Sequence, residues 1–184
     1  MLSTFYAIIG IGAAIVLWAV SIKRKLAELD ENSRHAMYQI GVQLSSRFDA
    51  LTVLLDLTRS YTRQESDGLT EAMHTERRVI TANSTPADVL HQEGIIAEAL
   101  AWIAMVTQES PELKVHQDYI TTMDAVAIFD NMVHTSQLIY NDCVTKLNRE
   151  VRRFPVVMIA GIMGFRQRDY LEEPSAQADL PHMK

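Results

Sequence analysis

The chain has 184 residues, of which 48% are apolar and 22% charged, and its formal net charge is -6. This composition excludes a low-complexity disordered chain, and the acidic balance argues against a general nucleic-acid binder, which needs a basic face to displace counterions from phosphate. The single cysteine, Cys143, excludes an intramolecular disulfide and a zinc site built on cysteines.

The first 22 residues form an apolar segment without charge. About 20 apolar residues, each rising about 1.5 Å in a helix, cross the hydrocarbon core of a bilayer, and Tyr6 and Trp18 fall where interfacial aromatic residues are expected. The basic residues that follow directly are Lys23, Arg24 and Lys25. A cleaved signal peptide has its basic residues before a shorter apolar stretch. Residues 1–25 are therefore predicted to be an uncleaved transmembrane anchor.

The charges beside this anchor predict its orientation. Because positive residues near a span favour the cytoplasmic side, the N-terminus should lie outside the membrane and the remaining chain in the cytoplasm. A core helix is the less favoured alternative, since core helices rarely run this long without a charge. Gly10 and Ala14 are spaced so that two membrane helices could approach closely.

Two prolines and one polar stretch divide the rest of the chain into predicted helices. Thr85-Pro86 and Ser110-Pro111 each place a capping side chain before a proline, which is typical of helix starts. The stretch 59–68 contains no aliphatic side chain, so an apolar stripe cannot continue through it. No segment alternates with a period of two over enough residues to indicate a sheet. The predicted helices are residues 26–62, 65–82, 87–108 and 112–154.

The first and last of these helices carry apolar stripes with alternating steps of three and four residues, which are typical of coiled coils. In the last helix the stripe continues without a slip from Tyr119 to Phe154. Such stripes favour an elongated bundle over a compact globule. We therefore predict an all-α protein, in which the N-terminal transmembrane helix is followed by an elongated antiparallel four-helix bundle over residues 26–154. Two helices are long, and two short ones cover only the end distal to the membrane.

Three polar side chains interrupt these stripes, namely Arg47 in the first helix and Asp130 and Gln137 in the last. If both long helices approach the membrane at their outer ends, Arg47 stands about 31 Å above it at about 1.5 Å per residue. The same rise places the segment between Asp130 and Gln137 at that height. We predict that Arg47 pairs with Asp130, and that Gln137 joins them in a structural polar layer that fixes the helix register. A ligand or proton-relay site is the alternative.

Asn141 and Asn148 lie seven residues apart, beside stripe residues on one face of the last helix. Amides at such positions either form hydrogen bonds between the helices of one bundle or specify which partner a helix takes. Both interpretations stay open, and the pair is the candidate partner face.

Helical bundles can also hold metal ions through Glu-x-x-His motifs and further glutamates. Glu71-x-x-His74 and Asp88-x-x-His91 resemble this pattern, but no glutamate interrupts the stripes of the two long helices. No HExxH, glycine-rich phosphate loop or GxSxG motif occurs, and Cys143 falls in the middle of a predicted helix. The sequence predicts no catalytic residue, no metal site and no cofactor.

An apolar segment follows the bundle. Residues 156–165, VVMIAGIMGF, are too few to span a bilayer, and arginines bracket them on both sides. Because the last helix should return to the membrane level, residues 155–173 are predicted to be membrane-proximal. The apolar side chains either pack on the lower halves of the long helices, which is the favoured interpretation, or dip into the headgroup zone. Residues 174–184 are predicted to form a disordered tail.

Several short runs together resemble the LemA family of bacterial membrane proteins. They are Val42-Gln43-Leu44, Arg47-Phe48-Asp49, Pro111-Glu112-Leu113-Lys114, Tyr140-Asn141, Asn148 with Arg152-Arg153-Phe154-Pro155, and Gly164-Phe165 with Tyr170. The resemblance covers about residues 1–173 and rests on the order and spacing of the runs. It implies one N-terminal anchor, an elongated helical bundle and no established enzymatic activity. Thr52 stands where a proline is common in the family, which should leave the first helix straighter.

These observations predict a membrane-anchored scaffold or adaptor, not an enzyme, that acts by protein-protein interaction at the cytoplasmic face of the bacterial inner membrane. Its expected partners are membrane lipid around residues 1–22, and either another protein or further copies of the chain, with no nucleic acid. Two other functions stay open. They are a metal-dependent helical-bundle enzyme and a membrane-surface sensor that works through residues 156–165.

Overall fold

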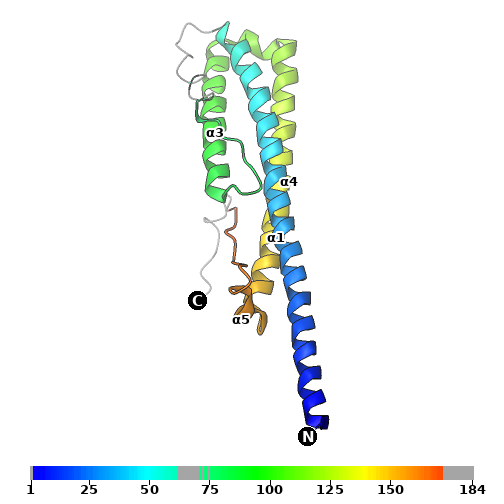
Figure 1. Ribbon diagram of the computed structural model, residues 1–184. Coiled ribbons are helices and arrows are strands. Elements are labelled where there is room, and N and C mark those ends of the chain that lie inside the picture. Colours follow the sequence, from blue (N-terminus) through cyan, green and yellow to red (C-terminus); the bar gives the residue numbers. More distant parts are fainter. Residues whose placement is uncertain (1, 62–70, 72, 74, 172–184) are drawn as a thin grey trace, which may run out of the picture.

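One continuous helix forms the first third of the chain. The computed structural model describes residues 2–61, 71, 73 and 75–171, and in it α1 runs from Leu2 to Arg59 (Figure 1). The predicted anchor and the first predicted bundle helix are therefore a single element. Because position 52 holds threonine and not proline, every residue around it keeps the backbone N–H that an unbroken helix needs.

The other helices are shorter. α3 spans Pro86–Glu109, α4 spans Gln117–Arg152 and α5 spans Val156–Ala160, and the 3-10 helix η1 covers Pro111–Val115. The described part of the chain contains no β-strand, so the predicted all-α class is confirmed. Pro111 starts η1 and not the long helix, so the predicted start of that helix at residue 112 is wrong by five positions.

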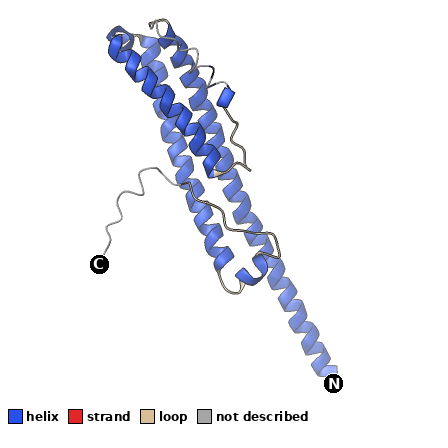
Figure 2. Cartoon of the chain, turned by 90° about the vertical axis from the view of Figure 1, so that its left-hand side faces the viewer, coloured by secondary structure: helices blue, strands red, loops and turns tan. Residues whose placement is uncertain are grey.

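α1 and α4 lie side by side in antiparallel directions, and α3 packs beside α1 in the half farther from the N-terminus (Figures 1 and 2). The N-terminal part of α1 projects beyond the other helices, and α5 lies against α1 at the lower end of α4. The shape is elongated, as the stripes predict. Three long helices, α1, α3 and α4, pack together in the residues that the structure describes, and residues 71, 73, 75 and 76 are helical as well.

Of the predicted helix at 65–82, residues 65–70, 72 and 74 lie outside the described residues. Residues 71, 73, 75 and 76 are helical, whereas the last six positions, 77–82, are not. There the backbone forms hydrogen bonds with the buried side chain of Gln92 instead of with groups of its own helix. Gln92 Oε1 accepts from Arg78 N at 2.9 Å, and Gln92 Nε2 donates to Glu76 O at 3.0 Å. The backbone is satisfied by a contact with α3, so the prediction that a helix continues to residue 82 is wrong.

Two apolar clusters hold the helices together. The larger joins α1, α3 and α4, and it buries most of the predicted stripe of α4. The smaller joins α5 to the lower parts of α1 and α4 and consists of Leu26, Leu147, Val151, Val156 and Ala160. The buried stripe residues of α4 are Val126, Val133, Tyr140, Val144, Leu147 and Val151. The stripe read from the sequence is therefore the buried face of this helix.

Gly41 allows the non-helical segment at residues 77–81 to cross closely over α1. A Cβ at this position would overlap the carbonyl oxygen of Ile80 and would lie 2.9 Å from its carbonyl carbon. We expect Gly41→Ala to lower the free energy of unfolding by about 2 kcal/mol, because backbone atoms must move to admit the methyl group. Denaturant unfolding of the purified full-length chain measures this.

Gly94 is the matched control for this substitution. It is also helical, but a Cβ added there would meet no neighbouring group within 4 Å. Gly94→Ala is expected to raise stability by about 0.5 to 1 kcal/mol through the lower entropy of the unfolded chain. Equal effects of the two substitutions would show that Ile80 does not press on α1.

Candidate functional site

The last described segment, residues 166–171, runs along α4 without forming a helix, and we name it the strap. Asn148 Nδ2 donates to Arg168 O and Asn148 Oδ1 accepts from Arg168 N, both at 2.9 Å. Asn141 brackets Leu171 in the same way, at 2.8 and 2.9 Å. Each amide supplies the pair of hydrogen bonds that a neighbouring β-strand would otherwise give. The strap is therefore held through its backbone.

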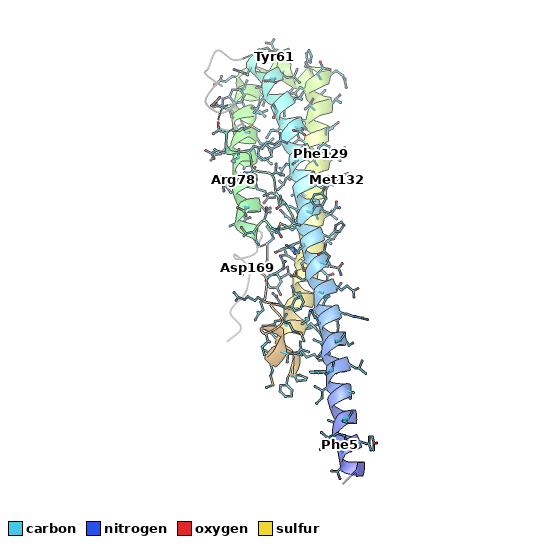
Figure 3. The ribbon with its side chains drawn as sticks, viewed as in Figure 1. Phe5, Tyr61, Arg78, Phe129, Met132 and Asp169 are labelled. Carbon is cyan, nitrogen blue, oxygen red and sulfur yellow. The ribbon has the colours of Figure 1, made fainter. Side chains whose placement is uncertain are left out.

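The spacing of the two asparagines suits an extended chain. Seven helical residues rise about 10.5 Å, and the three extended steps from Arg168 to Leu171 span about 10 Å. Between the two asparagine contacts with the strap, Tyr140 Oη donates to Asp169 O at 2.9 Å, and burial raises the pKa of Tyr140 further above neutral pH. Figure 3 shows Asp169 beside the lower half of the bundle.

The strap also contacts α1. Arg168 Nε donates to Asp30 Oδ1 at 2.9 Å, and both side chains are about a quarter exposed. Gly164, which has a φ of 84°, turns the chain from α5 into the strap. The strap therefore ties the lower half of α4 to α1, where α3 does not reach.

The candidate partner face is thus occupied by the chain itself. Asn148 is buried and Asn141 is half-buried, and each amide bonds to the strap. An amide carries a donor and an acceptor side by side, which match the N–H and C=O of one extended residue. The backbone groups inside a helix are already paired, so an extended segment fits these two side chains better than a helix does.

Arg47 and Asp130 meet at the height that the helical rise predicts. Arg47 Nη2 lies 2.8 Å from Asp130 Oδ1, and the Arg47 side chain is 11% exposed against 55% for Asp130. Gln137 does not join them, because its Nε2 donates to Glu93 Oε1 of α3 at 2.7 Å. The predicted layer of three residues is therefore two separate contacts, about two helical turns apart along α4.

A groove runs between α1 and α4 on the flank opposite the strap. Ile139 lines the groove and Asn141 binds the strap, and these two residues lie about 200° apart around α4. Its two parts have volumes of about 400 and 460 Å³. None of its lining residues is Asp, Glu, Lys or Arg. The main lining side chains are Asn32, Gln39 and Gln43 of α1 and Ile128, Met132 and Ile139 of α4. Figure 3 labels Met132 on this helix.

The N-terminal part of α1 has the character expected of an anchor. Its best 18-residue window has a mean hydropathy of 2.3, and only 6% of that window is buried. The apolar side chains around Tyr6 and Trp18 are exposed in the described structure. α3 is also long and apolar enough to cross a membrane, but its buried face packs into the bundle core. The long exposed apolar helix is compatible with a membrane anchor at the N-terminus.

Comparison of the sequence with models of known protein families gives a match. A protein-family model described as the LemA family matches residues 36–184. The chain belongs to the LemA family. The match contains the Arg47–Asp130 pair, both asparagines and the strap, whereas the apolar N-terminal segment lies before it. No curated protein matches the chain.

For this LemA family member, the groups that could hold a metal are engaged otherwise or lie outside the described residues. Asp88 forms the capping box of α3 with Thr85, and the hydrogen bond from the Thr85 backbone lowers the pKa of Asp88. His91 Nε2 lies 3.7 Å from Glu76 Oε2, and His74 is not among the described residues. Within the described ranges no three His, Cys, Asp or Glu side chains gather. Metal analysis of the purified full-length chain tests the enzyme alternative directly.

Cys143 lines the groove and is half-buried. Burial raises the pKa of its thiol above the ordinary value, and the neighbouring Asp142 carboxylate raises it further. The thiolate needed for nucleophilic chemistry is therefore scarce at neutral pH. The position suits packing and makes the residue a usable chemical reporter for the groove.

Proposed function

We propose that this protein is a membrane-anchored helical scaffold that acts by pairing with a second copy of itself. In this proposal the N-terminal part of α1 spans the bacterial inner membrane, with the N-terminus outside and the bundle in the cytoplasm. The exposed apolar face of this segment and the basic residues after it support that orientation. The groove between α1 and α4 carries the binding function.

The observation that carries the proposal is a second apolar stripe on α4. Ile128, Met132, Thr135 and Ile139 follow one another in steps of four, three and four residues, which is the pattern of a coiled-coil contact. The first stripe of α4 is buried against α1, whereas these four residues are exposed. A helix with two such stripes can contact two helices at once. The second contact is therefore available to another chain.

The chemistry of the groove suits a second copy. The chain carries a formal charge of -6, so most of its surfaces would repel a second copy of the chain. The groove lining contains amides, hydroxyls, apolar groups, the imidazole of His35 and the thiol of Cys143, but no Asp, Glu, Lys or Arg. Two copies can therefore meet there without like-charge repulsion.

The small residues of the span lie on the same face of α1 as the groove. Asn32 follows Ala14 by 18 residues and Gln39 follows Ser21 by 18 residues, which is five turns at about 3.6 residues per turn. Ala14 and Gly10 are exposed, and a Cβ at Gly10 would meet nothing. Two copies anchored in one membrane run parallel, so both surfaces can close in one symmetric contact.

Disulfide crosslinking in native membranes tests this contact. In a Cys143→Ser background, Ile139→Cys is expected to give a covalent dimer as the main product after mild oxidation, because a two-fold contact brings equivalent residues together. Leu138→Cys is the matched control. Its native side chain is 57% exposed against 54% for Ile139, but it points about 100° away.

Three outcomes decide the proposal. A dimer from Ile139→Cys alone supports pairing through the groove. Equal crosslinking of both variants would mean random collision and would contradict it. Crosslinking of Ile139→Cys mainly to one other membrane protein, in near-stoichiometric amount, would also overturn self-pairing and would make the protein an adaptor.

A further inference from the structure

We propose that the junction of α4 and α5 is a second membrane contact that binds the headgroups of anionic phospholipids beside the point where α1 leaves the bilayer. This inference rests on the proposed anchoring by α1 and is independent of self-pairing. The surface consists of the exposed apolar side chains of Phe154, Met158 and Ile162 and the basic side chains of Lys25, Arg149, Arg152 and Arg153. We name this surface the basal patch.

The position of the basal patch follows from its packing. Val156 and Ala160 are buried in the small cluster with Leu26, and Ile22 of α1 packs against the same cluster. Ile22 is the last residue of the uncharged segment. α5 therefore lies within about two helical turns of the place where α1 would enter the headgroup region. Figure 1 shows α5 at the end of the bundle that faces the N-terminus.

The outer face of the same segment is apolar and exposed. Phe154 is 76% exposed, Met158 66% and Ile162 86%, while the inner residues Val156 and Ala160 are buried. Packing on the long helices therefore leaves several large apolar side chains of this segment exposed. A soluble protein rarely exposes several large apolar side chains together unless they contact something. At the membrane surface, such side chains insert among the headgroups.

The basic residues beside these side chains match an anionic lipid surface. Lys25, Arg149, Arg152 and Arg153 line a concavity of about 520 Å³ together with Glu150. Glu150 Oε1 lies 3.0 Å from Lys25 Nζ, and neither Arg152 nor Arg153 has an ion-pair partner in the described ranges. The local charge is thus positive although the whole chain is acidic. Guanidinium groups in this setting bind phosphate oxygens.

Charge and shape together give an upright orientation. The acidic remainder of the bundle is repelled by an anionic leaflet, whereas its base is attracted. The basal patch and the span then hold one rigid helix, α1, at two points instead of one. The angle between the bundle and the membrane is therefore restricted. A restricted angle would also help the groove to meet the groove of a second anchored copy.

Lipid-borne and aqueous quenchers test the contact on the full-length chain in vesicles. An environment-sensitive fluorophore is attached at Ile162→Cys in the Cys143→Ser background. In vesicles of neutral lipid with a third of phosphatidylglycerol, we expect quenching by lipid-borne nitroxide and protection from aqueous iodide. Val79→Cys is the matched control, since Val79 is 73% exposed but lies in the segment that crosses α1 at Gly41, about five helical turns beyond Ile22. Its probe should show the reverse.

The charged part of the basal patch is tested by Arg152→Gln with Arg153→Gln. Each basic residue near an anionic surface contributes about fivefold to binding, so the docking equilibrium should fall about 25-fold on anionic vesicles and little on neutral ones. Both arginines are exposed, so the fold should keep its thermal midpoint. If the access of iodide to the probe at position 162 is unchanged by this double substitution, headgroup recognition is contradicted.

Two further arms separate the sources of failure. A probe at Ile15→Cys reports the span itself. If it is open to iodide, the anchoring proposal fails, whereas if it is lipid-quenched while the Ile162 probe faces water, only the present inference fails. If inorganic phosphate gives the same protection on neutral vesicles as phosphatidylglycerol does, the concavity is a site for free phosphate and the lipid assignment is overturned.

Discussion

Replacing Asn148 by alanine is expected to release the strap from α4 and to lower the free energy of unfolding by about 2 kcal/mol. The buried amide makes both hydrogen bonds to the backbone of Arg168, and each is worth about 1 kcal/mol net. Amide hydrogen exchange at Arg168 and Leu171 should rise well above that of α4. Denaturant unfolding of the full-length chain gives the free-energy change.

Asn131→Ala provides the matched control in the same helix. Asn131 is exposed and its Nδ2 donates only to Ala127 O of its own helix, at 3.0 Å, so its removal should change stability by less than about 0.5 kcal/mol. Unchanged exchange at Arg168 in Asn148→Ala would mean that the buried side chain of Leu171, and not the asparagine bracket, holds the strap.

The helical periodicities that the sequence displays are the parts of the fold that it predicts best. The stripe from Tyr119 onward is the buried face of α4, and counting residues at a constant rise places Arg47 opposite Asp130, as the ion pair between them shows. Both inferences need only the regular geometry of a helix. They do not depend on where any other segment lies.

Apart from the bond between Gln137 and Glu93, the contacts that sequence reasoning missed join a helix to a segment that is not helical. Gln92 replaces the helical hydrogen bonds of Arg78, and the asparagine pair binds a strap 20 to 30 residues farther along the chain. Neither partner has a periodic pattern from which its position could be inferred. One signal was available. Gly164 precedes six residues without a helical apolar stripe, which indicates an extended segment. Asn141 and Asn148, seven residues apart on one face of α4, could have indicated where that segment packs.

Gln137 shows the limit of predicting polar contacts from height alone. Its position on the stripe of α4 is as expected, but its amide bonds to Glu93 of α3 and not to Arg47. Counting residues along two helices gives the height of a side chain above the membrane. The partner of that side chain also depends on which helix packs beside it. The position of α3 follows from packing across the whole bundle, so this partner could not be read from the stripes.

Removing Asp130 should cost more than removing Arg47. In Asp130→Ala, the guanidinium of Arg47 stays in the bundle at 11% exposure without its counter-charge, and its Nε already lacks a hydrogen-bond partner in the described structure. We expect a loss of about 2 kcal/mol, below the cost at a fully buried pair because water reaches the half-exposed carboxylate site. Asp124→Ala, on the exposed face of α4, should change stability by less than about 0.5 kcal/mol.

In Arg47→Leu, by contrast, the remaining carboxylate of Asp130 is 55% exposed and is solvated by water, while leucine adds apolar contact to the seam. We expect stability within about 1 kcal/mol of the native chain, and the double variant Arg47→Leu with Asp130→Ala should recover most of the loss seen in Asp130→Ala. If the ion pair also fixes the register of α1 against α4, Arg47→Leu should show more than one set of amide resonances despite its retained stability. A single set would contradict that role, because an apolar seam with no polar position then specifies one register by packing alone.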